Sequence, residues 1–161
     1  MTNFQNPLKL LTFYAENVFG VGINIFIFSA ILLFVLHSFL ILLITKGFGR
    51  YISGVSISGK PRISFLPYAF AMFLIALTHI MDQLFFAYMI DGMGVFTDPL
   101  VSFYFVGEMY SSAGYGNYQL SPEWRGLPIL LAFSGLFAVS ISTAGLFSML
   151  QMLLDEHKKN K

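Results

Sequence analysis

The sequence contains no cysteine, so disulfides, zinc–thiolate sites and thiol catalysis are excluded. Charged residues are also scarce, because they make up 11% of the 161 residues, whereas soluble domains carry about a quarter. The net charge of +1 provides no basic surface that would neutralise the phosphates of a nucleic acid. We therefore expect no nucleic-acid partner.

Charge is missing above all from three long apolar runs, residues 18–45, 63–90 and 126–154. The first and third runs contain no Asp, Glu, Lys or Arg, and the second contains only Asp82. Each run exceeds the roughly 20 residues that a helix needs to cross a bilayer core. A cleavable signal peptide is a poor alternative for the first run, since its apolar core would be only about 7–15 residues long. The sequence predicts an all-α membrane protein with three transmembrane helices, surrounded by membrane lipid.

Basic residues predict how these helices are oriented. They gather between the first and second runs and after the third (Lys46, Arg50, Lys60, Arg62, Lys158, Lys159 and Lys161). Residues 91–125 hold four acids and one base. By the positive-inside rule, the loop 46–62 and the tail 155–161 are cytoplasmic and the N-terminus lies outside. Several glycines and Pro61 within 46–62 are typical of a loop.

The N-terminal segment, residues 1–17, precedes the first apolar run. Its stretch PLKLLTFYAE carries one base and one acid, Lys9 and Glu16. It fits either a short helix along the membrane interface or the ordinary disorder of a chain terminus.

A shorter apolar segment lies between the second and third runs. Residues 98–110, DPLVSFYFVGEMY, begin with an acid and a proline, which is typical of a helix start. Such a helix would rise about 20 Å, too little to cross a hydrocarbon core of roughly 30 Å. It is followed by SSAGYGN, residues 111–117, which lacks helix-forming character. The pair predicts a re-entrant loop, and irregular backbone at membrane depth is tolerated only inside protein or along a watery cavity.

The segment 111–117 is suited to binding a small monovalent cation through oxygen atoms. Removing water from such an ion requires replacement oxygens, which inward-facing backbone carbonyls supply. The candidate carbonyls are those of Ala113, Gly114, Tyr115 and Gly116. Glycine permits the unusual dihedral angles of a carbonyl ladder, and Ser112 adds a hydroxyl oxygen at its inner end. We expect Tyr115 to point away from the axis and brace the ladder, and we expect several chains to surround the ion, because one strand cannot encircle it.

These residues carry a resemblance to a known family. Residues 96–147 resemble the pore module of potassium channels, whose signature is Thr-Val-Gly-Tyr-Gly, and more closely that of small bacterial three-helix ion channels. The matching motifs are Tyr104-Phe105, Gly114-Tyr115-Gly116, Pro122-Glu123-Trp124-Arg125 and Ser142-Thr143-Ala144. His37 resembles the family's histidine in the first helix, and His79 with Asp82 resembles its His-x-x-acid pair in the next helix. The resemblance covers most of the chain from residue 30 to residue 151.

The resemblance implies a pore module over residues 63–154. Its parts would be an outer helix at 63–90, a pore helix at 98–110, a filter at 111–117 and an inner helix at 127–154. It implies a homotetramer in the inner membrane of a bacterium that conducts K⁺ passively. The implied K⁺ ligands are Ser112, Ala113, Gly114 and Tyr115, and the implied supports of the filter are Glu108, Ser111 and Asn117. No enzymatic activity, small-molecule substrate or cofactor is implied beyond the permeant K⁺ or Na⁺.

Three filter positions depart from the family signature. Ser112 keeps the hydroxyl of Thr but loses the methyl group that stiffens it, Ala113 packs more weakly than Val, and Asn117 stands where Asp is common. Glu108 holds the position of a pore-helix Glu that contacts that Asp in related channels, and it could accept a hydrogen bond from the Asn117 amide. The softer filter leaves a weakly selective K⁺/Na⁺ channel as the alternative. A non-conducting membrane assembly partner is the alternative from a different class.

Polar and small residues within the spans have two interpretations each. His79 and Asp82 share one face of the second helix, and ionisable groups at membrane depth indicate function or pairing. We favour a polar contact that fixes helix packing, including His37, over a proton-sensitive gate, and a metal site is favoured least because no further strong ligand is visible. Gly135 and Gly145 in the third span either allow close packing or act as hinges.

Overall fold

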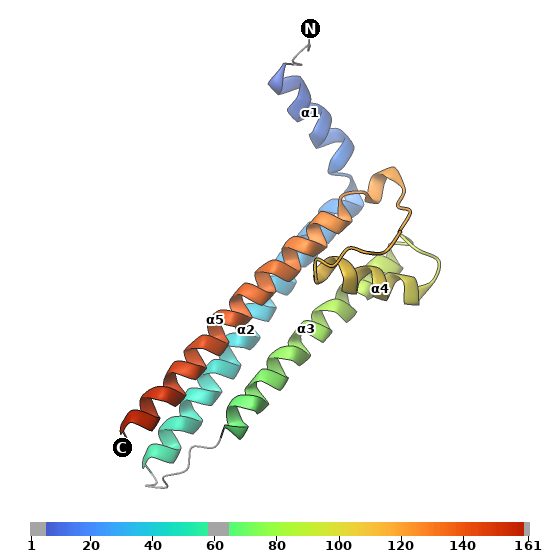
Figure 1. The fold of residues 1–161 in the computed structure, drawn as a ribbon. Coiled ribbons are helices and arrows are strands. Elements are labelled where there is room, and N and C mark those ends of the chain that lie inside the picture. The colour runs from blue at the N-terminus through green and yellow to red at the C-terminus, as the bar shows by residue number, and fades with distance from the viewer. Residues whose placement is uncertain (1–5, 58–64, 160–161) are drawn as a thin grey trace.

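Three long helices form the body of the molecule. In the computed structural model, which describes residues 6–57 and 65–159, they are α2 (Val21–Ile57), α3 (Leu66–Gly92) and α5 (Leu127–Lys159). Each contains a stretch long and apolar enough to cross a membrane. α2 and α5 run side by side and make the most extensive contact of any helix pair, with α3 packed beside them (Figure 1). The prediction of an all-α membrane protein with three spans is confirmed.

α2 is longer than the first predicted span. Its 37 residues rise roughly 55 Å, against a hydrocarbon core of roughly 30 Å. The prediction of a loop over 46–62 is wrong up to Ile57, and the rest of that loop lies outside the described residues. Phe48 and Ile52 are buried in the extension. Burial of such side chains stabilises by about 1.5–3 kcal/mol each, which outweighs the roughly 1 kcal/mol that each glycine costs a helix.

α5 also continues beyond its predicted end at residue 154. It runs to Lys159, so most of the predicted tail 155–161 is helical, although Asp155, His157 and Lys158 are exposed, and residues 160–161 lie outside the described part. Met149 is fully buried and Glu156 is nearly so. The helix is therefore held against the bundle to within a turn of its end.

Two apolar clusters fill the bundle, one towards each end. The first includes Phe26, Phe86, Phe105 and Leu131. The second includes Ile41, Phe48, Ile75 and Met149. Between them lie three buried polar residues, His37, Asp82 and Ser142. Each stands near the middle of its own helix, so this polar layer lies close to the middle of the membrane that the helices would span.

A short helix, α4 (Pro99–Tyr110), begins near the C-terminal end of α3 and ends deep in the bundle. The Asp98 carboxylate accepts a hydrogen bond from the Leu100 N–H (2.9 Å) and caps the helix start. Its twelve residues rise about 18 Å. The Tyr110 hydroxyl reaches Asp82, which lies in the buried polar layer. α4 therefore enters to about mid-depth and goes no further.

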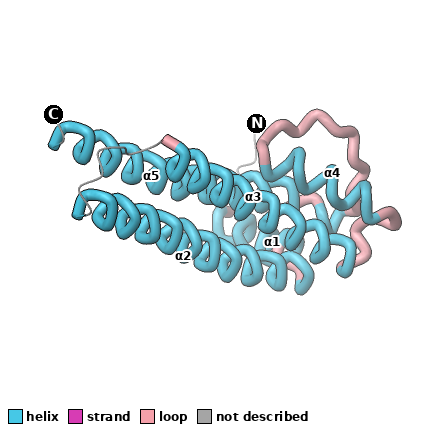
Figure 2. The backbone as a smooth tube through the Cα atoms, turned by 90° about the horizontal axis from the view of Figure 1, so that it is seen from below, coloured by secondary structure: helices cyan, strands magenta, loops and turns pink. Residues whose placement is uncertain are grey.

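The chain after α4 returns to the end of the bundle from which α4 came. It passes through a 3₁₀ turn, Pro122–Trp124, before α5 begins (Figure 1). Most of the loop segments accordingly lie around α4 at one end of the long helices (Figure 2). This is the re-entrant arrangement expected for residues 98–117.

A further helix, α1 (Pro7–Val18), precedes the bundle. The Asn6 side chain caps it by accepting a hydrogen bond from the Leu8 N–H (3.0 Å). Figure 1 shows α1 extending away from the end of the bundle, and Leu8 and Leu11 are exposed. Of the two alternatives for the stretch PLKLLTFYAE, the helix forms, and its place along the membrane interface stays a prediction.

The two glycines singled out in the third span lie at close helix contacts. A Cβ atom on Gly135 would overlap the main-chain carbonyl of Tyr110, which cannot rotate aside. A Cβ atom on Gly145 would lie 2.7 Å from the Ile41 side chain. Both positions thus allow neighbouring helices to approach, which supports the packing interpretation, while the hinge interpretation stays a prediction.

Gly135→Ala is expected to destabilise the protein by about 1–3 kcal/mol, because the added methyl group must push α5 away from the end of α4. Unfolding of the purified protein in detergent measures this. Gly47→Ala is the matched control, since Gly47 lies in α2 with nothing within 4 Å of an added Cβ. Alanine should leave stability unchanged there or raise it by up to about 1 kcal/mol. Equal stability of the two variants would contradict the close contact.

Candidate functional site

The segment after α4 turns its N–H groups back onto the end of that helix. The N–H groups of Ala113 and Gly114 both donate to the Glu108 carbonyl, at 2.9 and 3.3 Å. Within the described part of the chain, no carbonyl of residues 112–116 accepts a main-chain hydrogen bond. The N–H groups of Ala113 and Gly114 are bonded and the carbonyls are left free, which is what a cation-binding backbone needs.

Two residues of this segment have left-handed backbone conformations. Ser112 has a φ of +59° and Gly114 a φ of +57°. Glycine adopts this conformation freely, whereas it costs a residue such as serine about 1–2 kcal/mol. Ser112 is the one non-glycine residue with positive φ among those described. Strain of this kind persists where the surroundings enforce it, and it gathers at functional sites.

The buried carboxylate of Glu108 holds the far end of the segment. Its Oε2 accepts a hydrogen bond from the Gly116 N–H (2.6 Å), and its Oε1 accepts one from the Tyr118 hydroxyl (2.7 Å). A Cβ atom on Gly116 would overlap both the carboxylate and the Tyr118 ring, so glycine is required for this approach.

The titration of Tyr118 reflects the same contact. Burial of the hydroxyl and its hydrogen bond to Glu108 raise the pKa of Tyr118 to about 12. The stabilisation from this bond is therefore fully present below the ordinary pKa of tyrosine, near 10, and is lost as the pH rises through about 12. At physiological pH the Tyr118 hydroxyl is therefore protonated and donates its hydrogen bond to Glu108.

The predicted hydrogen bond between Glu108 and Asn117 is wrong. The two carboxylate oxygens bind Gly116 and Tyr118 instead, and Asn117 is exposed. The reason is that glycine at 116 lets the main chain approach the carboxylate, so that a backbone N–H takes the place foreseen for the amide. Ser111, another predicted supporting residue, donates from its hydroxyl to the Gly107 carbonyl (2.7 Å) and so satisfies an acceptor at the end of α4.

One face of the segment is uncovered in the single chain. Tyr115, expected to brace the segment from behind, is 82% exposed, and Tyr104 on α4 is 61% exposed. Both line a groove together with Phe103 and Gly107. The described residues of one chain thus neither enclose the segment nor cover its aromatic side.

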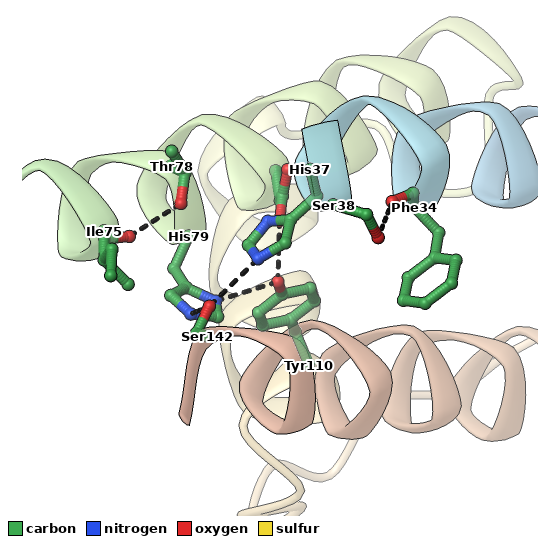
Figure 3. Close-up of polar contacts among 9 residues, drawn as sticks. Phe34, His37, Ser38, Ile75, Thr78, His79, Tyr110 and Ser142 are labelled. Atoms are coloured by element: carbon green, nitrogen blue, oxygen red, sulfur yellow. Dashed lines mark hydrogen bonds and ion pairs between the residues drawn. The ribbon is translucent and has the colours of Figure 1, made fainter. Parts of the chain in front are cut away.

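Behind the end of α4, five side chains from four helices form a closed ring of hydrogen bonds, here called the polar ring (Figure 3). The Asp82 Oδ2 atom accepts from the Tyr110 hydroxyl (2.8 Å) and lies 2.6 Å from His37 Nδ1. Ser142 Oγ lies 3.0 Å from His37 Nε2 and 2.9 Å from His79 Nε2. His79 Nδ1 lies 3.1 Å from the Tyr110 hydroxyl and closes the ring.

The polar ring is the polar layer between the two apolar clusters. Exposure is 1% for His37, 5% for Asp82 and 4% for Ser142. His37, His79 and Asp82 also offer ligand atoms within 4.8 Å of one another. All three side chains are engaged in hydrogen bonds with other members of the ring, however, so we assign no metal to them.

Tyr110, Ser142 and Tyr118 have roles in this site that the sequence did not reveal. Tyr110 and Ser142 complete the polar ring, and Tyr118 binds Glu108. One signal was available, because Tyr110 ends the short helix and so carries its hydroxyl to the deepest point of the re-entrant segment. Nothing local to Ser142 links it to residues on two other helices.

Glu108→Ala is expected to free the outer end of the segment. The Gly116 N–H and the Tyr118 hydroxyl both lose their acceptor, and hydrogen bonds to charged groups contribute about 1.5–3 kcal/mol each. Hydrogen–deuterium exchange across residues 112–118 should therefore rise at least about tenfold, while exchange in the buried middle of α2 stays the same.

Glu123→Ala is the control for that experiment. Glu123 is exposed and accepts a hydrogen bond from the Ser121 hydroxyl at 3.2 Å, away from α4. Its loss should leave exchange across 112–118 unchanged. If Glu108→Ala exchanged no faster than wild type, Glu108 would not hold the segment.

Comparison with known proteins agrees with this geometry. Residues 69–152 match the model of the family described as "Ion channel", and this range covers more than half of the chain. It includes nearly all of α3, the whole of α4 and the returning segment, and most of α5. No curated protein and no solved structure matches the chain. Because this family model covers more than half of the chain, the protein belongs to the ion channel family.

Proposed function

We propose that four copies of this chain form a channel that conducts K⁺ passively across a bacterial inner membrane. The ions pass along the axis of the tetramer, between the carbonyl oxygens of Ala113, Gly114, Tyr115 and Gly116. The Ser112 hydroxyl supplies a further oxygen at the inner end. The ion exchanges water for these oxygens and then regains its water, so no chemical step is catalysed.

The segment 112–116 is the observation that carries this proposal. Its amides at 113, 114 and 116 donate to α4, two to a main-chain carbonyl and one to the Glu108 carboxylate. Free carbonyls can replace the hydration shell of a cation, and bound amides keep the backbone that bears them in place. The left-handed residues Ser112 and Gly114 alternate with Ala113, and this alternation changes the direction of successive peptide planes.

The direction of α4 supports a cation as the permeant ion. Its C-terminal end lies at mid-depth, next to Asp82, and the C-terminus of a helix carries the equivalent of about half a negative charge. Four such ends around one axis stabilise a cation at the depth where it would otherwise lose most of its hydration energy.

Exposure in the single chain supports an oligomer. The carbonyl-bearing residues 112–115 are exposed, and so are the large aromatic side chains of Tyr104 and Tyr115 beside them. One such segment reaches an ion from one side only. Fourfold symmetry gives the ion carbonyls on all sides and places the Tyr104–Tyr115 face against the neighbouring chain.

The distribution of charge supports an orientation with the N-terminus outside. Lys46 and Arg50 lie in the part of α2 that faces the end of α5 bearing Lys158, while Asp91 and Asp98 lie at the opposite end beside α4. Basic residues stay in the cytoplasm. α4 therefore enters from the outer side of the membrane.

A weakly selective K⁺/Na⁺ channel is the second candidate. Ser112 lacks the methyl group of the family's Thr, and Ala113 lacks the branched side chain of its Val. Both changes leave the backbone less firmly packed, and a softer ladder discriminates less between ions of different size.

Gly114→Ala is expected to lower the K⁺ current by at least about tenfold, because alanine is strained by about 1–2 kcal/mol at a positive φ and rotates the carbonyls away. Assembly should be retained, since nothing lies within 4 Å of an added Cβ. Flux through the purified protein in liposomes measures the current, and size-exclusion chromatography measures assembly.

Gly94→Ala is the matched control. Gly94 has a φ of +68° and equally open surroundings, but it lies in the loop between α3 and α4. Its substitution brings the same backbone strain outside the filter and should leave the current intact. Equal losses in both variants would assign the effect to folding, and the absence of any wild-type current from intact tetramers would favour the non-conducting partner.

The double substitution Ser112→Thr with Ala113→Val is expected to raise the permeability ratio of K⁺ over Na⁺ several-fold, since both side chains stiffen the ladder. Reversal potentials of the variant and the wild type give this ratio. An unchanged ratio would show that these two positions do not limit selectivity.

A further inference from the structure

The polar ring has a fixed requirement for hydrogen atoms. Its five contacts join Asp82, His37, Ser142, His79 and Tyr110 in a closed cycle, with two contacts for each side chain. Each contact needs one hydrogen between its two heavy atoms. A complete ring therefore holds five hydrogens.

The side chains supply four hydrogens when both histidines are neutral and Asp82 is ionised. Ser142 and Tyr110 each carry one, and each neutral imidazole carries one. One contact is then left with two lone pairs facing each other. A single additional proton fills that contact, and it makes an imidazolium of one histidine or a carboxylic acid of Asp82.

The same additional proton balances the charge. With an ionised Asp82 and two neutral histidines, the ring carries −1 in the middle of the bundle, where an unpaired charge is expensive. With one proton more, the ring is neutral as a whole and has all of its hydrogen bonds. With two more, it carries +1 and has six hydrogens for five contacts.

No other ionisable side chain faces the ring in the described structure. On α2 the nearest is Lys46, nine residues from His37 and about 13 Å along the helix. On α3, Tyr68 lies towards the far end, Tyr88 is exposed and Asp91 lies beside the start of α4. On α4, Tyr104 is exposed and Glu108 is bound to the filter segment. α5 has no titratable residue before Asp155. The proton balance of the ring is thus set by His37, His79 and Asp82.

The ring is also attached to the filter. Tyr110 is the last residue of α4 and is followed directly by Ser111 and Ser112. Its hydroxyl is held by Asp82 and His79, and its carbonyl lies against Gly135 of α5. A contact that opens at Tyr110 therefore releases the inner end of the filter segment.

We propose that the polar ring is a binding site for one proton shared among His37, His79 and Asp82, and that the channel conducts while this site holds a single proton. The inference rests on the proposed function. Acid delivers a second proton to the remaining neutral imidazole, so that two donors face each other and a positive charge is left unpaired. The ring opens, Tyr110 loses its fixed position, and conduction falls.

The proton content of the ring can be measured without any current. The chain has three histidines, and the exposed His157 near the end of α5 serves as an internal reference. In protein labelled with ¹⁵N-histidine and assembled in nanodiscs, the nitrogen shifts at pH 7.5 should show one imidazolium shared between His37 and His79. Two neutral imidazoles together with an ionised Asp82, read from the ¹³C shift of its carboxyl group, would overturn the proposal.

The link to conduction is tested with His79→Gln. Glutamine offers one donor and one acceptor, as the neutral imidazole does, so the ring still closes with one proton on His37. The second proton then has to bind Asp82, and the midpoint of acid inhibition should fall by at least one pH unit. His157→Gln is the matched control and should keep the wild-type midpoint.

The nitrogen shifts and the midpoint of acid inhibition test the proton content of the ring and the proposed channel function separately. A midpoint that is the same in His79→Gln and in wild type overturns the link to conduction. If the wild type carried no current at any pH, the proposed function would fail, and the nitrogen shifts would still decide whether the ring holds its proton. Chromatography of His79→Gln confirms that the variant assembles before its currents are compared.

Discussion

A polar group in the middle of a bilayer has no water to bond with, so it must find its partner within the protein. This constraint governs the place where α4 stops. The helix ends at mid-depth with its last carbonyls, a tyrosine hydroxyl and a run of amides, all of which need partners there. The amides of the following segment fold back onto the helix carbonyls, and the Tyr110 hydroxyl joins the polar ring. The carbonyls of 112–116 accept no main-chain hydrogen bond in the described residues, and a permeant cation is the partner that we propose for them.

The helices around the end of α4 carry residues that fit against it or bond to it. α5 carries glycine where the Tyr110 carbonyl presses against it, and α3 contributes both His79 and Asp82 to the ring. α2 lies outside the family match and yet supplies His37, the residue that contacts both Asp82 and Ser142. α2 is therefore part of the polar core that it shares with α3, α4 and α5, as well as an additional membrane span.

Much of this architecture was predictable from the sequence, because composition and length determine how many helices cross a bilayer. The start of α4 at Asp98-Pro99 and the non-helical course of 111–117 followed from local chemistry. The ends of α2 and α5 did not, because the glycines and the basic residues Lys46 and Arg50 suggest a loop until Phe48 and Ile52 are seen to be buried. The hydrogen bond from the Gly116 N–H to Glu108 was also missed, because nearly every residue has a backbone N–H and the sequence does not indicate which one binds a carboxylate. The polar ring joins residues up to 105 positions apart, and no local pattern encodes such a contact.

The most direct measurement is the reversal potential of the purified wild-type protein in a planar bilayer, with K⁺ on one side and Na⁺ on the other. A ladder of free carbonyls that replaces the hydration shell of K⁺ places the reversal potential close to the K⁺ equilibrium value. A clear current that reverses near zero would contradict selection by these carbonyls.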